Sequence, residues 1–90
     1  MSLDELRQAL DRIDNEVMSL LAQRAHVILQ VAEFKKQHGG PVHDPAREDA
    51  IIARLSDLNP GPLPSDTVAR IYRKIIEEMR NFEAVVHDAS

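Results

Sequence analysis

The sequence contains no cysteine and no tryptophan, and its aromatic residues are limited to Phe34, Tyr72 and Phe82. The absence of cysteine excludes disulfides, thiolate chemistry and Cys-ligated zinc. With so few aromatic rings there is no stacking platform for bases, which argues against binding of single-stranded nucleic acid. Proteins that bind a phosphate backbone normally carry a basic face, whereas this chain has a formal charge of −4 and no long basic run. We therefore expect no nucleic-acid partner.

Long apolar runs are also missing. No stretch approaches the ~20 apolar residues that span a bilayer. The N-terminal residues alternate charge with leucine, unlike a secretory signal peptide. We therefore expect no membrane partner and a cytoplasmic location. The length of 90 residues predicts a single domain, residues 1–90, and the hydrophobic content of 43% predicts that it is folded.

The hydrophobic pattern predicts three helices and no strand, because no segment alternates with period two. The first helix covers about residues 3–38 and ends at Gly39-Gly40-Pro41. Its apolar residues repeat at steps of three and four, as in a coiled coil, with Arg24 filling the one gap. This seam consists of Leu3, Leu6, Leu10, Ile13, Val17, Leu20, Val27, Val31 and Phe34. The second helix covers about residues 44–58 and opens at Asp44-Pro45, and the third covers about residues 64–86.

The length of the first helix predicts a dimer. At 1.5 Å per residue it extends roughly 54 Å, whereas a compact domain of this size has a radius of gyration of about 12 Å. Two shorter helices cannot cover its apolar seam, and a second copy of the chain can. The predicted fold is therefore all-α, with two three-helix chains forming an intertwined six-helix homodimer.

Charged residues interrupt the apolar faces of all three helices. Arg24 lies in the seam, and Lys35 returns almost to the same angle eleven residues later. Glu48 and Glu83 share the apolar faces of the second and third helices. Any one of these charges alone is most simply explained as structural, by snorkelling or by fixing the register. Several together indicate an anionic ligand, since unpaired buried charges are costly and arginine donates two hydrogen bonds to a carboxylate.

One further arginine, Arg7, lies beside the seam near the start of the first helix. It is separated from Arg24 by about 25 Å along that helix, too far for one small ligand. If two copies of the first helix pair antiparallel, Arg7 of one chain approaches the site of the other. The sequence therefore predicts an active site shared between chains.

Other residues suggest no additional site. The four histidines show no spacing typical of metal ligands, so no metal is expected. Gly39-Gly40 lacks the lysine and serine of a phosphate-binding loop. The basic residues of the third helix, with Glu77 and Glu78 nearby, are interpreted as a solvated face; they are Arg70, Arg73, Lys74 and Arg80.

Taken together, these residues resemble the all-helical (AroQ-class) chorismate mutases, over essentially the whole chain. The matching stretches are LRQALDRID, LLAQRAHVILQVAEFKK, DPAREDAIIARL and IYRKIIEEMRNFE. The charged positions that fit the family are Arg7, Arg24, Lys35, Asp44, Arg47, Glu48 and Glu83.

The resemblance implies an isomerase that rearranges chorismate to prephenate, on the path to phenylalanine and tyrosine, without metal or cofactor. It also implies an intertwined dimer with two identical sites. By family analogy, Arg24 and Arg7 of the partner chain bind the two substrate carboxylates, and Lys35 donates to the ether oxygen. Glu48 and the start of the second helix near Asp44 hold the ring hydroxyl, and Arg47 supports this network.

Two positions depart from many relatives. Met79 stands where many have serine, which removes one polar contact, and Glu83 stands where some have glutamine. Glutamine can donate to the ether oxygen at any pH, whereas glutamate donates only when protonated. We therefore expect activity to rise toward acidic pH, and Glu83→Gln to flatten the profile.

Three alternatives remain open at this stage. The first is isochorismate pyruvate-lyase activity on the same scaffold, and the second is a domain of a larger bifunctional enzyme. The third is a helical dimerisation or regulatory module without catalysis.

Overall fold

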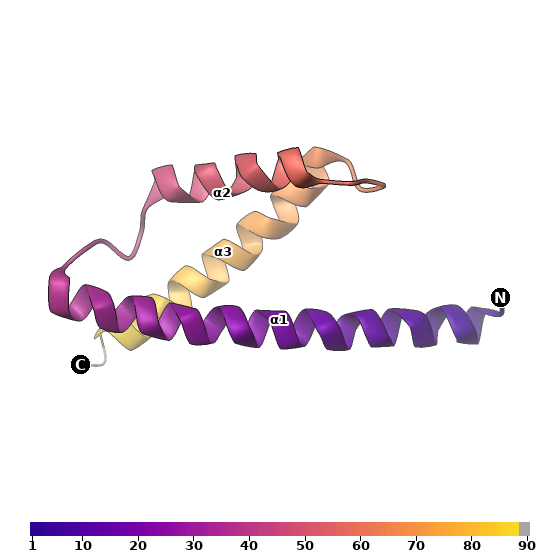
Figure 1. Cartoon of the computed structure of the whole chain (residues 1–90), viewed down its shortest axis with the longest axis horizontal. Helices are drawn as coiled ribbons and strands as arrows, with labels where there is room; N and C mark the ends of the chain where they lie inside the picture. The colour runs from indigo at the N-terminus through magenta and orange to yellow at the C-terminus, as the bar shows by residue number, and fades with distance from the viewer. Residues whose placement is uncertain (89–90) are drawn as a thin grey trace.

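The computed structural model describes residues 1–88 and consists of three helices (Figure 1). They are α1 (Leu3–His38), α2 (Pro45–Leu58) and α3 (Ser65–Asp88). No strand occurs within these residues, and the all-helical prediction is confirmed. Helix α3 continues to Asp88, beyond the end expected near residue 86.

Local hydrogen bonds fix where α1 begins and ends. The Ser2 side chain accepts from the Glu5 backbone N–H at 3.1 Å, and the Glu5 carboxylate accepts from the Ser2 backbone N–H at 3.4 Å. This reciprocal arrangement is a capping box, which satisfies two otherwise free donors of the first turn. At the other end, Gly39 adopts φ +82°, a conformation that L side chains rarely adopt. The glycine therefore ends the helix where the sequence indicates a stop.

Helix α2 begins as its sequence predicts. The Asp44 carboxylate accepts from the backbone N–H of Arg47 at 3.1 Å, and Pro45 occupies the first helical position. Residues 39–44 connect the end of α1 to this cap, so the chain turns back and brings the start of α2 over the C-terminal half of α1 (Figure 1).

Helix α3 holds the other two together. It packs against both α1 and α2, whereas α1 and α2 do not pack against each other within residues 1–88. Figure 1 shows α3 running obliquely from the far end of α2 back to the C-terminal end of α1. The single chain is long and thin, with extents of 53 × 25 × 15 Å and a radius of gyration of 16.1 Å. A compact domain of this length has a radius of gyration of about 12 Å.

The hydrophobic core of one chain is small. Ile51 and Ile52 of α2 pack with Ile76 of α3, and all three side chains are at least nine-tenths buried. The partly buried residues around them are Leu55, Ala69 and Tyr72. Most of the apolar seam of α1 lies outside this core.

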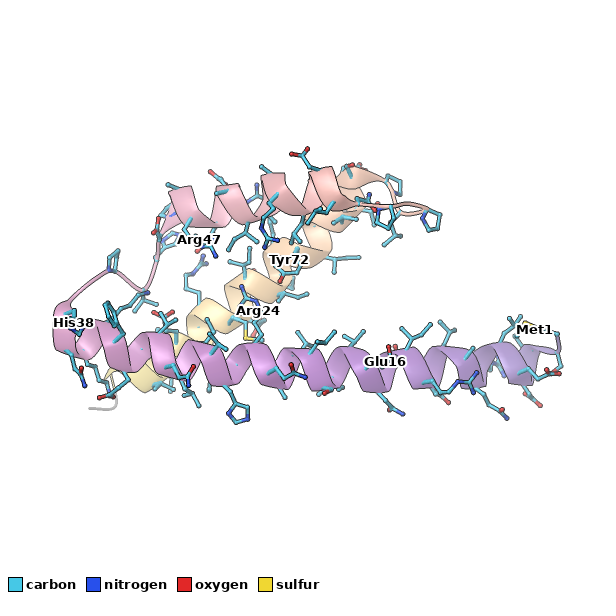
Figure 2. All side chains as sticks on the ribbon, in the orientation of Figure 1. Met1, Glu16, Arg24, His38, Arg47 and Tyr72 are labelled. Carbon is cyan, nitrogen blue, oxygen red and sulfur yellow. The ribbon has the colours of Figure 1, made fainter. Side chains whose placement is uncertain are left out.

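That seam is open to solvent along almost its whole length. Its exposed members are between 46% and 62% exposed: Leu3, Leu6, Leu10, Ile13, Val17, Leu20, Val27 and Phe34. Figure 2 shows no other helix beside the stretch of α1 around Glu16. At roughly 25 cal/mol per Å² of apolar surface, this is a large unfavourable contact with water, and nothing within residues 1–88 covers it.

Candidate functional site

A cavity of about 480 Å³ lies where the C-terminal half of α1, the start of α2 and the C-terminal half of α3 meet. Its wall carries both apolar and charged side chains. The apolar part includes Ile28, Val31, Ile51 and Ile76. The charged residues of the wall are Arg24, Lys35, Asp44, Arg47, Glu48, Arg80 and Glu83. The cavity therefore combines four cations with three carboxylates, and it has the size typical of a small-ligand site.

Arg24 lines this cavity and carries one unsatisfied donor. Its Nη1 atom is buried and has no hydrogen-bond partner within residues 1–88. The guanidinium carbon lies 5.8 Å from the centre of the Tyr72 ring, close enough for a cation–π interaction. The Tyr72 ring can stabilise the positive charge of the guanidinium, but it does not act as a hydrogen-bond acceptor for the Nη1 donor. A buried donor without a partner costs about 1–3 kcal/mol, so Arg24 is a candidate to bind an acceptor that residues 1–88 do not supply.

Lys35 and Glu83 form the deepest ion pair of the wall. The Lys35 Nζ donates to Glu83 Oε2 at 2.8 Å, and the two side chains are only 18% and 6% exposed. An ammonium group has three N–H donors, so this contact leaves donors of Lys35 available to a ligand. Helical periodicity predicted that Lys35 lies on the face of Arg24 and that Glu83 lies on the apolar face of α3. In the structure these two side chains are in contact.

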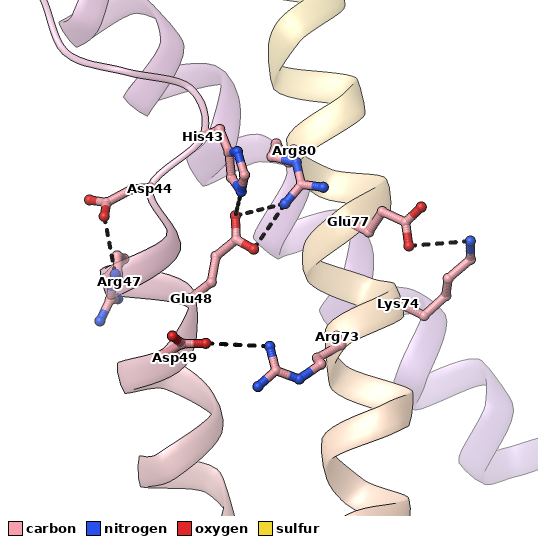
Figure 3. A network of polar contacts seen from close by, with 9 residues as sticks. All are labelled: His43, Asp44, Arg47, Glu48, Asp49, Arg73, Lys74, Glu77 and Arg80. Carbon is pink, nitrogen blue, oxygen red and sulfur yellow. Dashed lines mark hydrogen bonds and ion pairs between the residues drawn. The ribbon is translucent and has the colours of Figure 1, made fainter.

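Glu48 lies on the opposite side of the cavity, near the start of α2. Both of its carboxylate oxygens accept from Arg80 Nη1 at 2.9 Å (Figure 3). His43 Nε2 lies 3.8 Å from Glu48 Oε2, at the end of the loop that precedes the helix. Glu48 therefore keeps a fixed position with its charge compensated.

Asp44 and Arg47 complete the wall at the N-terminus of α2. The Asp44 side chain is committed to capping the helix through the Arg47 backbone N–H, as Figure 3 shows. The Arg47 side chain is exposed, and its guanidinium makes no ion pair within the described part of the chain. Figure 2 places it across from Arg24.

The remaining candidate, Arg7, lies far from the cavity. It is exposed, near the opposite end of α1, and it does not belong to the cavity wall. One chain thus brings together six of the seven candidate residues. The seventh remains apart, at a distance that the helix geometry already predicts.

The interpretation of Arg80 as part of a solvated face is wrong. Its side chain is 28% exposed, it pairs with Glu48 and it lines the cavity. The rest of that basic face is solvated as expected: Arg70, Arg73 and Lys74 are between 56% and 69% exposed and pair with surface carboxylates. At Lys74, Glu77 first and then Glu78 raise the pKa of the ammonium. Met79 also lines the cavity, so this turn of α3 contributes one apolar and one charged side chain.

Two structural features are absent from residues 1–88. None of the helices there combines the length and apolar character needed to cross a membrane. In the same residues, no group of three or more His, Cys, Asp or Glu side chains is placed to hold a metal ion.

The family model for chorismate mutase type II matches residues 6–84. The chain belongs to this family. It is 42% identical, over 86% of its length, to a bifunctional chorismate mutase/prephenate dehydratase from Neisseria gonorrhoeae, and covers 22% of that protein. It is 36% identical, over 90% of its length, to the bifunctional enzyme of the same name from Aquifex aeolicus, and covers 24% of it. The chain therefore spans less than a quarter of these curated relatives.

Solved structures of the family superpose closely on this chain. Form II of the chorismate mutase from Thermus thermophilus has a TM-score of 0.88 at 29% identity, covering 91% of this chain and 93% of the other. The chorismate mutase from Helicobacter pylori, solved in complex with prephenate, has a TM-score of 0.86 at 30% identity. That match covers 93% of this chain and 91% of the other.

Proposed function

We propose that this chain catalyses the rearrangement of chorismate to prephenate, with the cavity between α1, α2 and α3 as its active site. The observation that carries this proposal is the buried, unpartnered Nη1 of Arg24 in a cavity with more cations than carboxylates. Chorismate is a dianion with two carboxylates, an ether oxygen and a ring hydroxyl. Family membership supports this choice of ligand, and so does the prephenate complex of the Helicobacter pylori relative.

The reaction needs positioning more than it needs chemistry from the protein. The ether C–O bond breaks while a C–C bond forms between the enolpyruvyl methylene and the ring, and all atoms stay in one molecule. The enzyme must hold the substrate in its folded, chair-like shape and stabilise the charge that develops on the ether oxygen.

The described residues can be assigned to these tasks. Arg24 binds one carboxylate through its free donor, and Lys35 donates to the ether oxygen while it keeps its bond to Glu83. Glu83, when protonated, donates to the same oxygen. The ring hydroxyl donates to Glu48, close to the helix start capped by Asp44, and Arg47 supports this end of the site.

The second carboxylate requires a second copy of the chain. We propose a homodimer in which the seams of two α1 helices pair antiparallel, so that Arg7 of each copy completes the cavity of the other. The exposed seam of α1 and the 53 Å length of the chain support this arrangement. A cytoplasmic location, expected from the sequence, stays a prediction.

The activity is tested by following the loss of chorismate spectroscopically. We expect turnover by the unaltered chain, and a fall in kcat/KM of at least about 10² for Arg24→Ala, the usual cost of one preorganised donor. Arg70→Ala is the matched control, because Arg70 lies on the exposed face of α3 and, among the described residues, pairs with nearby Asp66 and Thr67. Isochorismate is assayed in parallel. Turnover of isochorismate alone indicates a pyruvate-lyase, and turnover of neither substrate indicates a non-catalytic module.

The shared site is tested by complementation. Arg7→Ala and Arg24→Ala chains are refolded separately and then together. In a mixed dimer, one site has both native arginines and the other has neither, so the mixture should regain about a quarter of the native activity. If both arginines served one site within a single chain, every site would lack one of them and mixing would restore nothing.

A further inference from the structure

Two ion pairs join α2 to α3, and they differ in where they lie. Arg80 contacts both oxygens of Glu48 at 2.9 Å, whereas Arg73 contacts Asp49 at 3.4 Å (Figure 3). The side chains of the first pair are 28% and 18% exposed, and those of the second are 56% and 71% exposed. Only the first pair lines the cavity.

The charges of the cavity wall explain why this pair matters to a ligand. Lys35 is neutralised by Glu83 and Arg80 by Glu48, which leaves Arg24 and Arg47 without ion pairs within residues 1–88. With the Asp44 carboxylate counted as well, the wall of one chain has one more cation than carboxylates, and Arg7 of the proposed partner chain would add the second positive charge that a dianionic ligand needs. If an uncharged residue replaced Arg80, the charge of the Glu48 carboxylate would be uncompensated in a part-buried wall. That carboxylate would then repel the dianion that the cavity is proposed to bind.

We propose that Arg80 is a positioning residue for this site: it holds the Glu48 carboxylate toward the cavity and cancels the repulsion between that carboxylate and a dianionic ligand. This inference rests on the proposed function. Arg80 acts through Glu48 and is not assigned a contact with the substrate. A single nitrogen, Nη1, reaches both oxygens of Glu48, so a positive charge at that point is the essential requirement.

The chain supplies a matched control for this role. Arg73 lies seven residues before Arg80, two turns earlier on nearly the same face of α3, and its partner Asp49 follows Glu48 directly. Arg73→Met and Arg80→Met therefore each remove one arginine that links the same two helices. They differ in where the carboxylate that loses its partner lies: Glu48 lines the cavity, whereas Asp49 lies on the outer surface.

The experiment measures steady-state kinetics with chorismate and the Kd of prephenate by calorimetry, with circular dichroism as a check on folding. We expect Arg80→Met to raise KM and the Kd of prephenate by about tenfold or more, with a smaller effect on kcat. Arg73→Met should change each by less than about twofold. Arg80→Lys, which keeps the charge, should stay within about threefold of the native chain.

A double-mutant cycle separates action through Glu48 from direct contact with the ligand. In a Glu48→Gln background no carboxylate remains to be compensated, so Arg80→Met should raise the Kd of prephenate by less than about threefold. The same tenfold loss in both backgrounds overturns the proposal, because it means that Arg80 contacts the ligand itself. Equal losses for Arg73→Met and Arg80→Met also overturn it, because they indicate a purely structural link between the helices.

The failure of this inference is distinguishable from the failure of the proposed function. If the native chain binds prephenate but does not convert chorismate, the activity is wrong while the Kd measurements still decide the role of Arg80. If it neither binds prephenate nor converts chorismate, the proposed function and the inference both fall.

Discussion

The two halves of α1 share the same heptad spacing but differ in what surrounds them. From Leu3 to Leu20 the seam is entirely apolar, lies in solvent and has no other helix beside it. From Arg24 onward the seam admits charge, and α3 packs against this half to enclose the cavity. The comparison teaches that a cation in the seam, accompanied by further inward-facing charges, favours a ligand site, whereas an uninterrupted apolar seam favours contact with another protein surface.

The largest effect is expected from placing a charge in the apolar half. Leu10→Asp removes little from a single chain, in which Leu10 is 58% exposed. In the proposed dimer it buries an unpaired carboxylate in each copy, at a cost of several kcal/mol. We expect dissociation in sedimentation velocity and a loss of activity of more than about 10³-fold. Gln8→Asp is the control, since it adds the same charge at an exposed position outside the seam. A Leu10→Asp chain that stays dimeric and active would contradict the pairing of the seams.

The next largest effect is expected from a substitution in the half of α1 that lines the cavity. Lys35→Ala removes the donor assigned to the ether oxygen and leaves Glu83 buried without its partner. We expect turnover to fall by about 10²–10³, the usual cost of one preorganised donor. Lys36→Ala is the neighbouring control, because Lys36 is exposed and does not line the cavity. A loss below about tenfold for Lys35→Ala would remove Lys35 from this role.

A smaller effect distinguishes how Glu83 works. A glutamine at position 83 donates an N–H at every pH, whereas a carboxyl group donates only while protonated. Glu83→Gln should therefore flatten the dependence of activity on pH, as the sequence predicts. The measurement is kcat/KM for chorismate across the pH range in which both chains stay folded. Parallel profiles for the two chains would exclude Glu83 as the donor to the ether oxygen.

The smallest effect tests how far the apolar half depends on its own local structure. Ser2→Ala removes the side-chain oxygen that accepts from Glu5 N–H, which should lower the free energy of unfolding by about 1 kcal/mol in chemical denaturation. Ser2→Asn keeps a cap and serves as the control. Turnover should be unchanged in both, because the capping contacts join Ser2 to Glu5 and involve no residue assigned to the site, while Arg7 stays on the same helix. A cost of several kcal/mol would mean that this end is held by more than its capping box.

Much of the fold was predictable because its signals are local. Gly39-Gly40-Pro41 ends α1, the pair Asp44-Pro45 starts α2, and the apolar steps of three and four define the faces. Arg24 and Lys35 were recognisable because they break an apolar pattern that is otherwise regular. Each of these inferences needs only residues on one helix.

Arg80 was missed for the opposite reason. On the helical wheel of α3 it cannot be separated from Arg73, seven residues earlier, and both lie among acidic neighbours. Only the crossing of α3 over the start of α2 places one in the cavity wall and leaves the other on the outer surface. Crossing points depend on contacts between residues far apart in the chain, and no periodicity within one helix reports them.

The position of α3 gives it control over the width of the cavity. Within residues 1–88, apart from the covalent loop at residues 39–44, α1 and α2 are joined only through α3. The distance between Arg24 on α1 and Glu48 on α2, which lie on opposite sides of the cavity, is therefore set by how α3 packs against both helices. Ala69 packs against the core residues that join α2 to α3, so a larger side chain at this position should press these two helices apart and change the width of the cavity.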